Sequence, residues 1–296
     1  MEKKLLKPAM LELIRRASCD LPPDVEEALS KSRKKEEKGS IAREALDVIL
    51  ENVSLARAQS TPICQDTGTN LYFVEAPLEL PEAELRAAIL GATRLATKKG
   101  YLRPNVVNPV TGKNTGDNVG IENPQIHWHQ HAKKSLRVSL MLKGGGCENV
   151  SIQYTLPDKS LGAGRDLEGV FRTVVDSAHR AQGKGCAPGI FGVGVGGDRL
   201  SSYLVAKEQL LRVLGDKNPD PALHKLERRC LDSINALGVG PMGFGGQTTA
   251  LGVKIGIAHR LPASYFVSIA YMCWACRRMT LTLGPDGAFK VAPERG

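Results

Sequence analysis

The sequence predicts a mixed α/β fold, of the α+β type, in which helices flank β-sheets. Two kinds of segment lead to this prediction: stretches with apolar residues at helical spacing, and short strand-like runs that alternate between apolar and polar residues. Glycine-rich turns separate these segments, and glycine supplies the positive φ angles that tight turns require.

The predicted helices begin with residues 41–59, where apolar side chains recur at helical spacing. Ser40 precedes this stretch and can serve as its N-cap. A later helix ends before Gly215. The full set of predicted helices is 41–59, 82–98, 166–181, 201–214 and 222–237.

Strand-like runs lie mainly in the second half of the chain, and several show alternation with period two. They are 136–142, 149–155, 189–195, 249–257 and 265–272. Glycine-rich turns at 111–117, 143–147, 192–197 and 238–246 lie between the predicted elements. Since no low-complexity linker and no internal repeat interrupts the chain, we expect a single compact domain over 1–296.

The amino-acid composition predicts an ordinary soluble protein. The 296 residues are 42% hydrophobic and 24% charged, and no apolar run approaches the roughly 20 residues of a membrane span. The N-terminal residues lack the apolar core of a signal peptide, so we expect a cytoplasmic protein. The net charge of +9 is diffuse and aromatic residues are only 5%, which disfavours nucleic-acid binding. The positive charge suits an anionic substrate or an acidic partner subunit.

Three short motifs suggest chemistry but have simpler explanations. Residues 192–197 match G-x-G-x-x-G, for which tight packing is a better explanation than a dinucleotide site. The histidines of 127–131 could bind metal, although an exposed polar edge is the simpler interpretation. Cys273 and Cys276 form a C-x-x-C pair, which leaves a structural zinc site open as an alternative.

Seven cysteines, an odd number spread over a long chain, do not form the pattern of a secreted disulfide framework. Reduced thiols or metal ligands are the better explanation, and spacing alone does not distinguish them. The seven are Cys19, Cys64, Cys147, Cys186, Cys230, Cys273 and Cys276.

Six local motifs follow one another along the chain. They are Cys64-Gln-Asp-Thr-Gly68, Leu102-Arg-Pro-Asn105, Lys143-Gly-Gly-Gly-Cys-Glu-Asn149, Cys186-Ala-Pro188, Gly240-Pro-Met-Gly243 and Cys273-Trp-Ala275. In their order and spacing these motifs resemble class I fumarate hydratases over about residues 10–282. The chain looks like the alpha subunit of the two-chain form, or the N-terminal domain of the single-chain form. L-tartrate dehydratase alpha subunits share the same motifs. The resemblance implies the mixed fold of the N-terminal domain of that class.

The resemblance implies that Cys64, Cys186 and Cys273 are the three thiolate ligands of a [4Fe-4S] cluster. One iron then has no protein ligand, and an open position on a Lewis acid suits a hydro-lyase. The remaining cysteines have no ligand role in that family, so Cys147 and Cys276 are interpreted as structural.

The resemblance also implies the substrate-binding residues. Gln65 and Asp66 match family residues that touch the substrate, and the Asp66 carboxylate could also carry a proton as a catalytic group. Arg103 matches the arginine that binds a substrate carboxylate, for which its planar fork is suited. Gly146 would bring backbone amide donors close to the same ligand.

One position departs from the family pattern. Where the family commonly has a histidine twelve residues before the third cysteine, this chain has Leu261 between Arg260 and Pro262. The family's active site also draws residues from a C-terminal domain or beta subunit, of which the sequence shows nothing after residue 282. We therefore expect a beta-subunit partner in an α2β2 assembly, with the catalytic C-terminal domain absent from this chain.

These observations together predict a hydro-lyase subunit that catalyses reversible hydration of fumarate to L-malate. The alternatives are an L-tartrate dehydratase alpha subunit and, from a different class, a non-catalytic iron–sulfur sensor of a dicarboxylate, which the Leu261 departure suggests.

Overall fold

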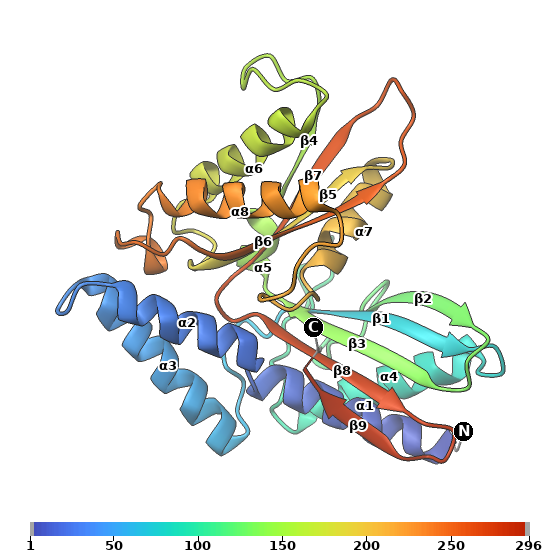
Figure 1. Cartoon of the computed structure of the whole chain (residues 1–296). Coiled ribbons are helices and arrows are strands. Elements are labelled where there is room, and N and C mark those ends of the chain that lie inside the picture. The colour runs from blue at the N-terminus through green and yellow to red at the C-terminus, as the bar shows by residue number, and fades with distance from the viewer. Residues whose placement is uncertain (1–2, 294–296) are drawn as a thin grey trace. The chain divides into compact units, whose positions relative to one another are not determined.

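The computed structural model describes residues 3–293 and separates into two compact units (Figure 1). Among these residues the first unit contains 3–23, 51–145 and 275–293, and the second contains 24–50 and 146–274. The predicted mixed α/β class is confirmed. The expectation of a single domain over residues 1–296 remains a prediction. No helix within residues 3–293 combines the length and apolar character needed to cross a membrane.

The first unit is built on a five-stranded sheet in the order β2-β1-β3-β8-β9, in which only the β1–β2 pair is parallel. Its strands are β1 (Thr69–Pro77), β2 (Gln125–His131), β3 (Leu136–Lys143), β8 (Arg277–Leu283) and β9 (Phe289–Ala292). Helices α1 (Lys3–Cys19) and α4 (Glu82–Lys98) lie along one face of this sheet (Figure 1).

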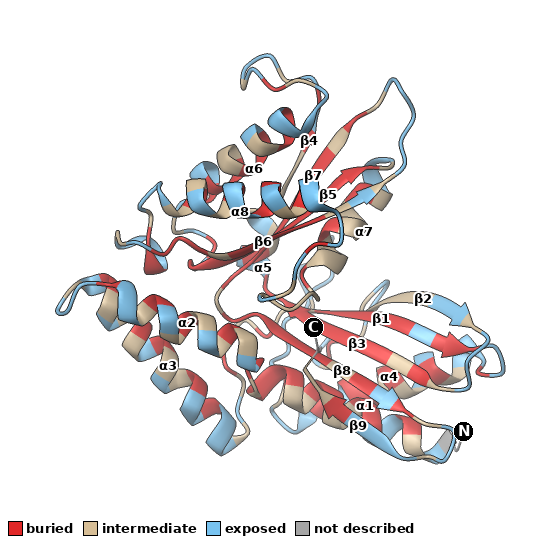
Figure 2. Cartoon of the chain, viewed as in Figure 1, coloured by how far each residue is buried: buried red, intermediate tan, exposed pale blue. Residues whose placement is uncertain are grey.

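The core of the first unit follows from period-two alternation along its strands. The side chains of β3 and β8 that share one face are apolar and buried against the two helices. They are Leu136, Val138, Leu140, Leu142, Met279, Leu281 and Leu283. Figure 2 shows this burial along the central strands, whereas the edge strand β2 is half-buried or exposed. Its His127 stacks on Phe73 with ring centroids 5.0 Å apart, and His129 is exposed, which supports the polar-edge interpretation.

The second unit contains a four-stranded sheet in the order β4-β7-β5-β6, and its β5–β6 pair is parallel. The strands are β4 (Ile152–Thr155), β5 (Gly189–Gly196), β6 (Ala250–Ala258) and β7 (Phe266–Met272). Its helices are α2 (Pro23–Lys35), α5 (Gly145–Asn149), α6 (Leu167–Ala181), α7 (Arg199–Gln209), α8 (Pro221–Asn235) and the 3-10 turn η1 (Pro241–Gly243). The chain passes from the second unit back to the first within α3 (Ile41–Gln59).

The glycines of residues 192–197 serve helix packing. A Cβ on Gly192 would lie 2.1 Å from the Ala206 carbonyl oxygen, and one on Gly194 would lie 2.0 Å from that of Ser202. Only glycine therefore lets α7 approach β5 this closely. The N-terminus of α7 is capped by Asp198, whose Oδ1 accepts a hydrogen bond from the Ser201 amide at 2.7 Å. This geometry supports the packing interpretation over a dinucleotide fingerprint.

The substitution Gly194→Ala should lower the free energy of unfolding by about 1–3 kcal/mol, because the added methyl overlaps a backbone carbonyl that cannot rotate away. Gly215→Ala is the matched control, since its added methyl would have no neighbour within 4 Å. Urea denaturation of both variants measures the difference. Equal stability of the two variants would contradict the packing account.

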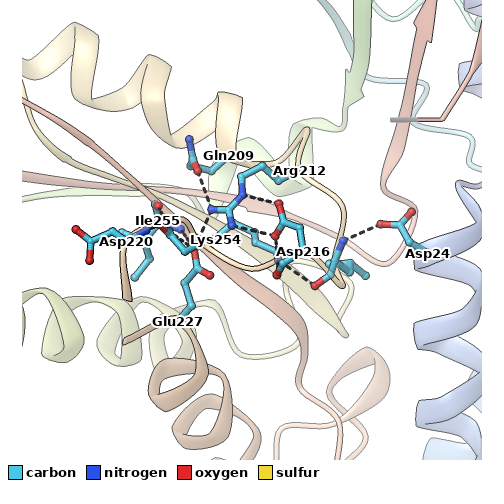
Figure 3. Close-up of polar contacts among 10 residues, drawn as sticks. Asp24, Gln209, Arg212, Asp216, Asp220, Glu227, Lys254 and Ile255 are labelled. Carbon is cyan, nitrogen blue, oxygen red and sulfur yellow. Dashed lines mark hydrogen bonds and ion pairs between the residues drawn. The ribbon is translucent and has the colours of Figure 1, made fainter. Parts of the chain in front are cut away.

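A buried ion network joins the helices of the second unit to β6 (Figure 3). Lys254 is 3% exposed and forms an ion pair with Asp216, which also accepts two hydrogen bonds from Arg212 at 2.8 and 2.9 Å. Arg212 donates to Glu227 at 2.9 Å, and Glu227 also accepts from the Ile255 amide at 2.7 Å. Burial tends to raise the pKa of Asp216, but hydrogen bonds from the two cations outweigh it and the pKa is lowered. The carboxylate therefore stays ionised in the network.

Candidate active site

The segment that carries Cys64 lies in the first unit, between α3 and β1. It is anchored just before the cysteine, where Ile63 donates its amide to the Ser18 carbonyl at 3.0 Å and accepts from Asn52 Nδ2 at 2.9 Å. Cys64 is half-buried and Gln65 is exposed. The anchors fix the backbone while both side chains remain accessible.

Asp66 joins this segment to the glycine run after β3. Its Oδ1 accepts from the Gly68 amide at 3.0 Å and its Oδ2 accepts from the Gly145 amide at 2.8 Å. Gly68 has φ +77°, and a Cβ there would lie 2.6 Å from the Lys143 carbonyl group. A Cβ on Gly144 would lie 2.9 Å from Asp66 Oδ2. The glycines are thus required for the close approach that fixes the carboxylate.

Arg103 is tied to the same segment through Thr67. The Thr67 hydroxyl oxygen accepts from the Arg103 amide at 3.2 Å and from Asn105 Nδ2 at 3.1 Å. Asn118 Nδ2 also donates to the Arg103 carbonyl at 2.8 Å. The backbone of Arg103 is therefore held while its side chain is exposed. Two of the six motifs and the start of a third, Lys143–Gly145, meet here in the first unit.

The other three motifs meet in the second unit. Cys186 is exposed at φ +56°, and its carbonyl accepts from the Trp274 amide at 3.4 Å. The Ala187 carbonyl accepts from the Met242 amide at 2.8 Å, which packs the Gly240–Gly243 turn against this loop. Cys273 is 8% exposed. The loops carrying Cys186 and Cys273 therefore lie side by side.

Cys147 contacts one of the predicted ligands. The Cys273 amide donates to Cys147 Sγ at 3.2 Å, and the Cys147 carbonyl accepts from Ser151 Oγ at 2.7 Å. Gly146, next to it in α5, is exposed, and a Cβ there would have no neighbour within 4 Å. The predicted amide donor at Gly146 is thus accessible, and Cys147 supports the Cys273 loop.

The remaining cysteines differ in surroundings. Burial raises the pKa of Cys19 to about 11 and that of Cys230 to about 12, so both thiols stay protonated within their helices. Cys276 is buried and accepts from Arg278 Nη1 at 3.3 Å. These positions agree with structural roles.

The donor chemistry suits an iron–sulfur group, because all seven cysteines lie outside disulfides and thiolates are the ligands that such groups use. Within the described residues, no three His, Cys, Asp or Glu side chains form a group that could hold a metal ion. Cys64 belongs to the first unit, and Cys186 and Cys273 belong to the second. The ligand set therefore stays a prediction.

The structure adds residues that the sequence analysis did not single out. Arg277 is 1% exposed, and its Nε and Nη1 have no hydrogen-bond partner within residues 3–293. Its Nη2 and the Asp66 carboxylate both lie beside Gly144. Thr67 lies inside the first motif, but the sequence could not show that its hydroxyl contacts Arg103 and Asn105, which lie far along the chain.

Leu261 is 74% exposed in the loop after β6, and His259 in the same loop is also exposed.

Known proteins are similar to this chain over most of its length. The family model described as fumarate hydratase (fumerase) matches residues 7–282. A protein of Geobacillus stearothermophilus, provisionally named a class I fumarate hydratase, is 45% identical over 289 residues, or 97% of this chain and 56% of that protein. The chain thus spans just over half the length of that relative.

Two relatives are named as alpha subunits of L(+)-tartrate dehydratase. The one from Methanocaldococcus jannaschii, provisionally named, is 36% identical over 274 residues, covering 91% of this chain and 94% of that protein. The one from Escherichia coli K12 is 31% identical over 277 residues, covering 92% and 89%. The family match includes residues of both units and all six motifs, and the chain therefore belongs to the fumarate hydratase (fumerase) family.

Proposed function

We propose that this chain is the cofactor-binding part of a hydro-lyase that interconverts fumarate and L-malate. The observation that carries the proposal is the Asp66 carboxylate, fixed by the amides of Gly68 and Gly145 directly after Cys64. Thr67 ties Arg103 to the same segment. A fixed carboxylate directly after a thiol, with an arginine whose backbone is tied to the same segment, suits a reaction that moves a proton on an anionic substrate.

We propose Cys64, Cys186 and Cys273 as the ligands of a [4Fe-4S] cluster. Two observations support this assignment. Cys64 and Cys186 are at least partly exposed and Cys273 lies in the loop after β7, and the chain belongs to the fumarate hydratase family. When bound by three thiolates, the cluster supplies a Lewis-acid iron with an open position, which lowers the barrier to C–O cleavage.

The residues of the chain then bind and orient the substrate. The Arg103 guanidinium can take one substrate carboxylate in a bidentate pair, and the exposed Gln65 amide can donate to the other. The Gly146 amide is a further donor. Because each Asp66 oxygen already accepts one amide proton, the carboxylate keeps a fixed orientation, with a remaining lone pair for the substrate proton.

A beta-type chain is the proposed partner, in an α2β2 assembly. Two relatives carry names that make them alpha subunits, and the fumarate hydratase relative is about twice as long as the region it shares with this chain. Both facts support a second polypeptide or domain that supplies the remaining acid and base groups.

The test compares substrates on the anaerobically reconstituted complex of this chain with its beta-type partner. L-Malate should be dehydrated with a kcat/KM about tenfold to a hundredfold above that for L-tartrate, which carries one extra hydroxyl group. A higher value for tartrate would support the tartrate dehydratase alternative, which the two alpha-subunit relatives favour. Tight dicarboxylate binding without turnover would support the alternative that the chain is a non-catalytic iron–sulfur sensor.

A further inference from the structure

A buried phenol lies among the thiols of the second unit. Tyr271, near the end of β7, is 2% exposed, and its hydroxyl has no hydrogen-bond partner within residues 3–293. A buried hydroxyl without a partner loses its hydrogen bonds to water and gains none in return, so tyrosine hydroxyls in protein interiors are usually paired. The position of this hydroxyl therefore calls for an acceptor.

The ring of Tyr271 is enclosed by the loop that carries Cys186. A Cβ on Gly185 would lie 2.4 Å from a ring carbon, and a Cβ on Gly189 would lie 2.4 Å from the hydroxyl oxygen. Phe191 packs edge-on against the ring, with centroids 4.9 Å apart at 85°. These contacts hold the ring in one place, with its hydroxyl against the backbone of the Cys186 loop.

Segments that carry cysteines lie next to Tyr271. Cys273 follows Tyr271 by two residues, its amide donates to Cys147 Sγ at 3.2 Å, and the Trp274 amide links to the Cys186 carbonyl. The buried phenol therefore lies between the Cys186 loop and the strand that leads to Cys273.

We propose that the Tyr271 hydroxyl donates a hydrogen bond to a sulfur of the Cys186 and Cys273 ligand pair and thereby sets the reduction potential of the bound cluster. This inference rests on the proposed function, because it needs the iron–sulfur group that these cysteines would hold. A hydrogen bond to sulfur stabilises the more negatively charged, reduced cluster and so raises its potential. Tyr271 is thus a residue that tunes the cofactor without contacting substrate.

The experiment measures the midpoint potential and the electron paramagnetic resonance spectrum of the reduced cluster in the anaerobically reconstituted full chain. In Tyr271→Phe the ring packing is kept and the donor is lost, so the potential should shift to a more negative value at unchanged iron and sulfide content. Placing 3-fluorotyrosine at position 271 makes the hydroxyl a stronger donor, and the shift should then be positive.

Tyr154→Phe is the matched control. The Tyr154 hydroxyl, on β4 of the same sheet, already donates to Asp176 Oδ2 at 2.6 Å, so its loss should leave the potential unchanged. Unchanged potentials in the Tyr271 variants with a full cluster would overturn this inference alone. A wild-type protein that takes up no cluster would overturn the proposed function and, with it, this inference. Should Tyr271→Phe fail to assemble, the sign of the shift with 3-fluorotyrosine decides the matter.

Discussion

Cys186→Ser should abolish cluster binding and lower hydro-lyase activity by a factor of about a thousand or more. A Lewis-acid metal contributes several kcal/mol to such a reaction, and each 1.36 kcal/mol corresponds to about tenfold in rate. Cys186 is exposed at the tip of its loop, so the change from sulfur to oxygen should leave the fold intact. Iron and labile sulfide analysis of anaerobically reconstituted protein, followed by an activity assay with the beta-type partner, measures the effect.

Cys230→Ala is the control for this prediction. Cys230 is fully buried in α8, and its raised pKa keeps the thiol protonated. Replacing this thiol should therefore leave the iron content unchanged. Circular dichroism of both variants checks that the fold is retained. Full iron content in Cys186→Ser would remove Cys186 from the ligand set.

The second large effect concerns stability and should come from Glu227→Leu. Glu227 is 4% exposed, and its Oε1 accepts from Arg212, Asn218 and the Ile255 amide at 2.9, 2.8 and 2.7 Å. Leucine has a similar size but leaves these three donors without their acceptor, and breaking a buried ion pair in this way costs about 3–5 kcal/mol. The urea concentration at which half of the second unit is unfolded should fall accordingly. Hydrogen exchange of the β6 backbone amides measures this unfolding.

Glu168→Leu provides the comparison for an exposed ion pair. Glu168 pairs with Arg229 and Arg172, and its side chain is 46% exposed. Water and salt screen such pairs, so a much smaller loss of stability is expected. If both substitutions destabilise the protein equally, burial of the network shown in Figure 3 is not what makes Glu227 important.

Local patterns predicted several helices of both units. The segments at 41–59 and 82–98 match α3 and α4, and 166–181 and 222–237 match α6 and α8 within two residues at either end. The predicted helix over 201–214 begins at Arg199 and ends at Gln209. The helical signal at 41–59 is strong because its apolar side chains repeat without a break.

Other elements carried weak or misleading signals. Helix α1 contains Pro8, which ordinarily interrupts a helix. Strand β8 begins with Arg277 and Arg278, and polarity alone would not place two arginines in a buried strand. The predicted strand over 149–155 was too long, because α5 occupies its start and β4 begins only at Ile152. The division into two units depends on pairing between distant strands, such as β3 with β8, which no local pattern reports.

For the candidate site, the resemblance supplied residue identities and the structure supplied their environments. The contact between Asp66 and the Gly145 amide joins positions 79 residues apart, and the Thr67 hydroxyl joins positions up to 38 apart. Such contacts depend on the tertiary fold. Tyr271 could not be singled out from sequence because its environment comes from glycines of another loop.

The interleaving of the two units along the chain has a consequence for synthesis on the ribosome. All described residues of the second unit lie before residue 275, so its strands are synthesised before β8 and β9. The sheet of the first unit cannot form completely until β8, the neighbour of β3, has been made. Until then the apolar strand β3 has an unpaired edge, and such an edge favours aggregation of the nascent chain.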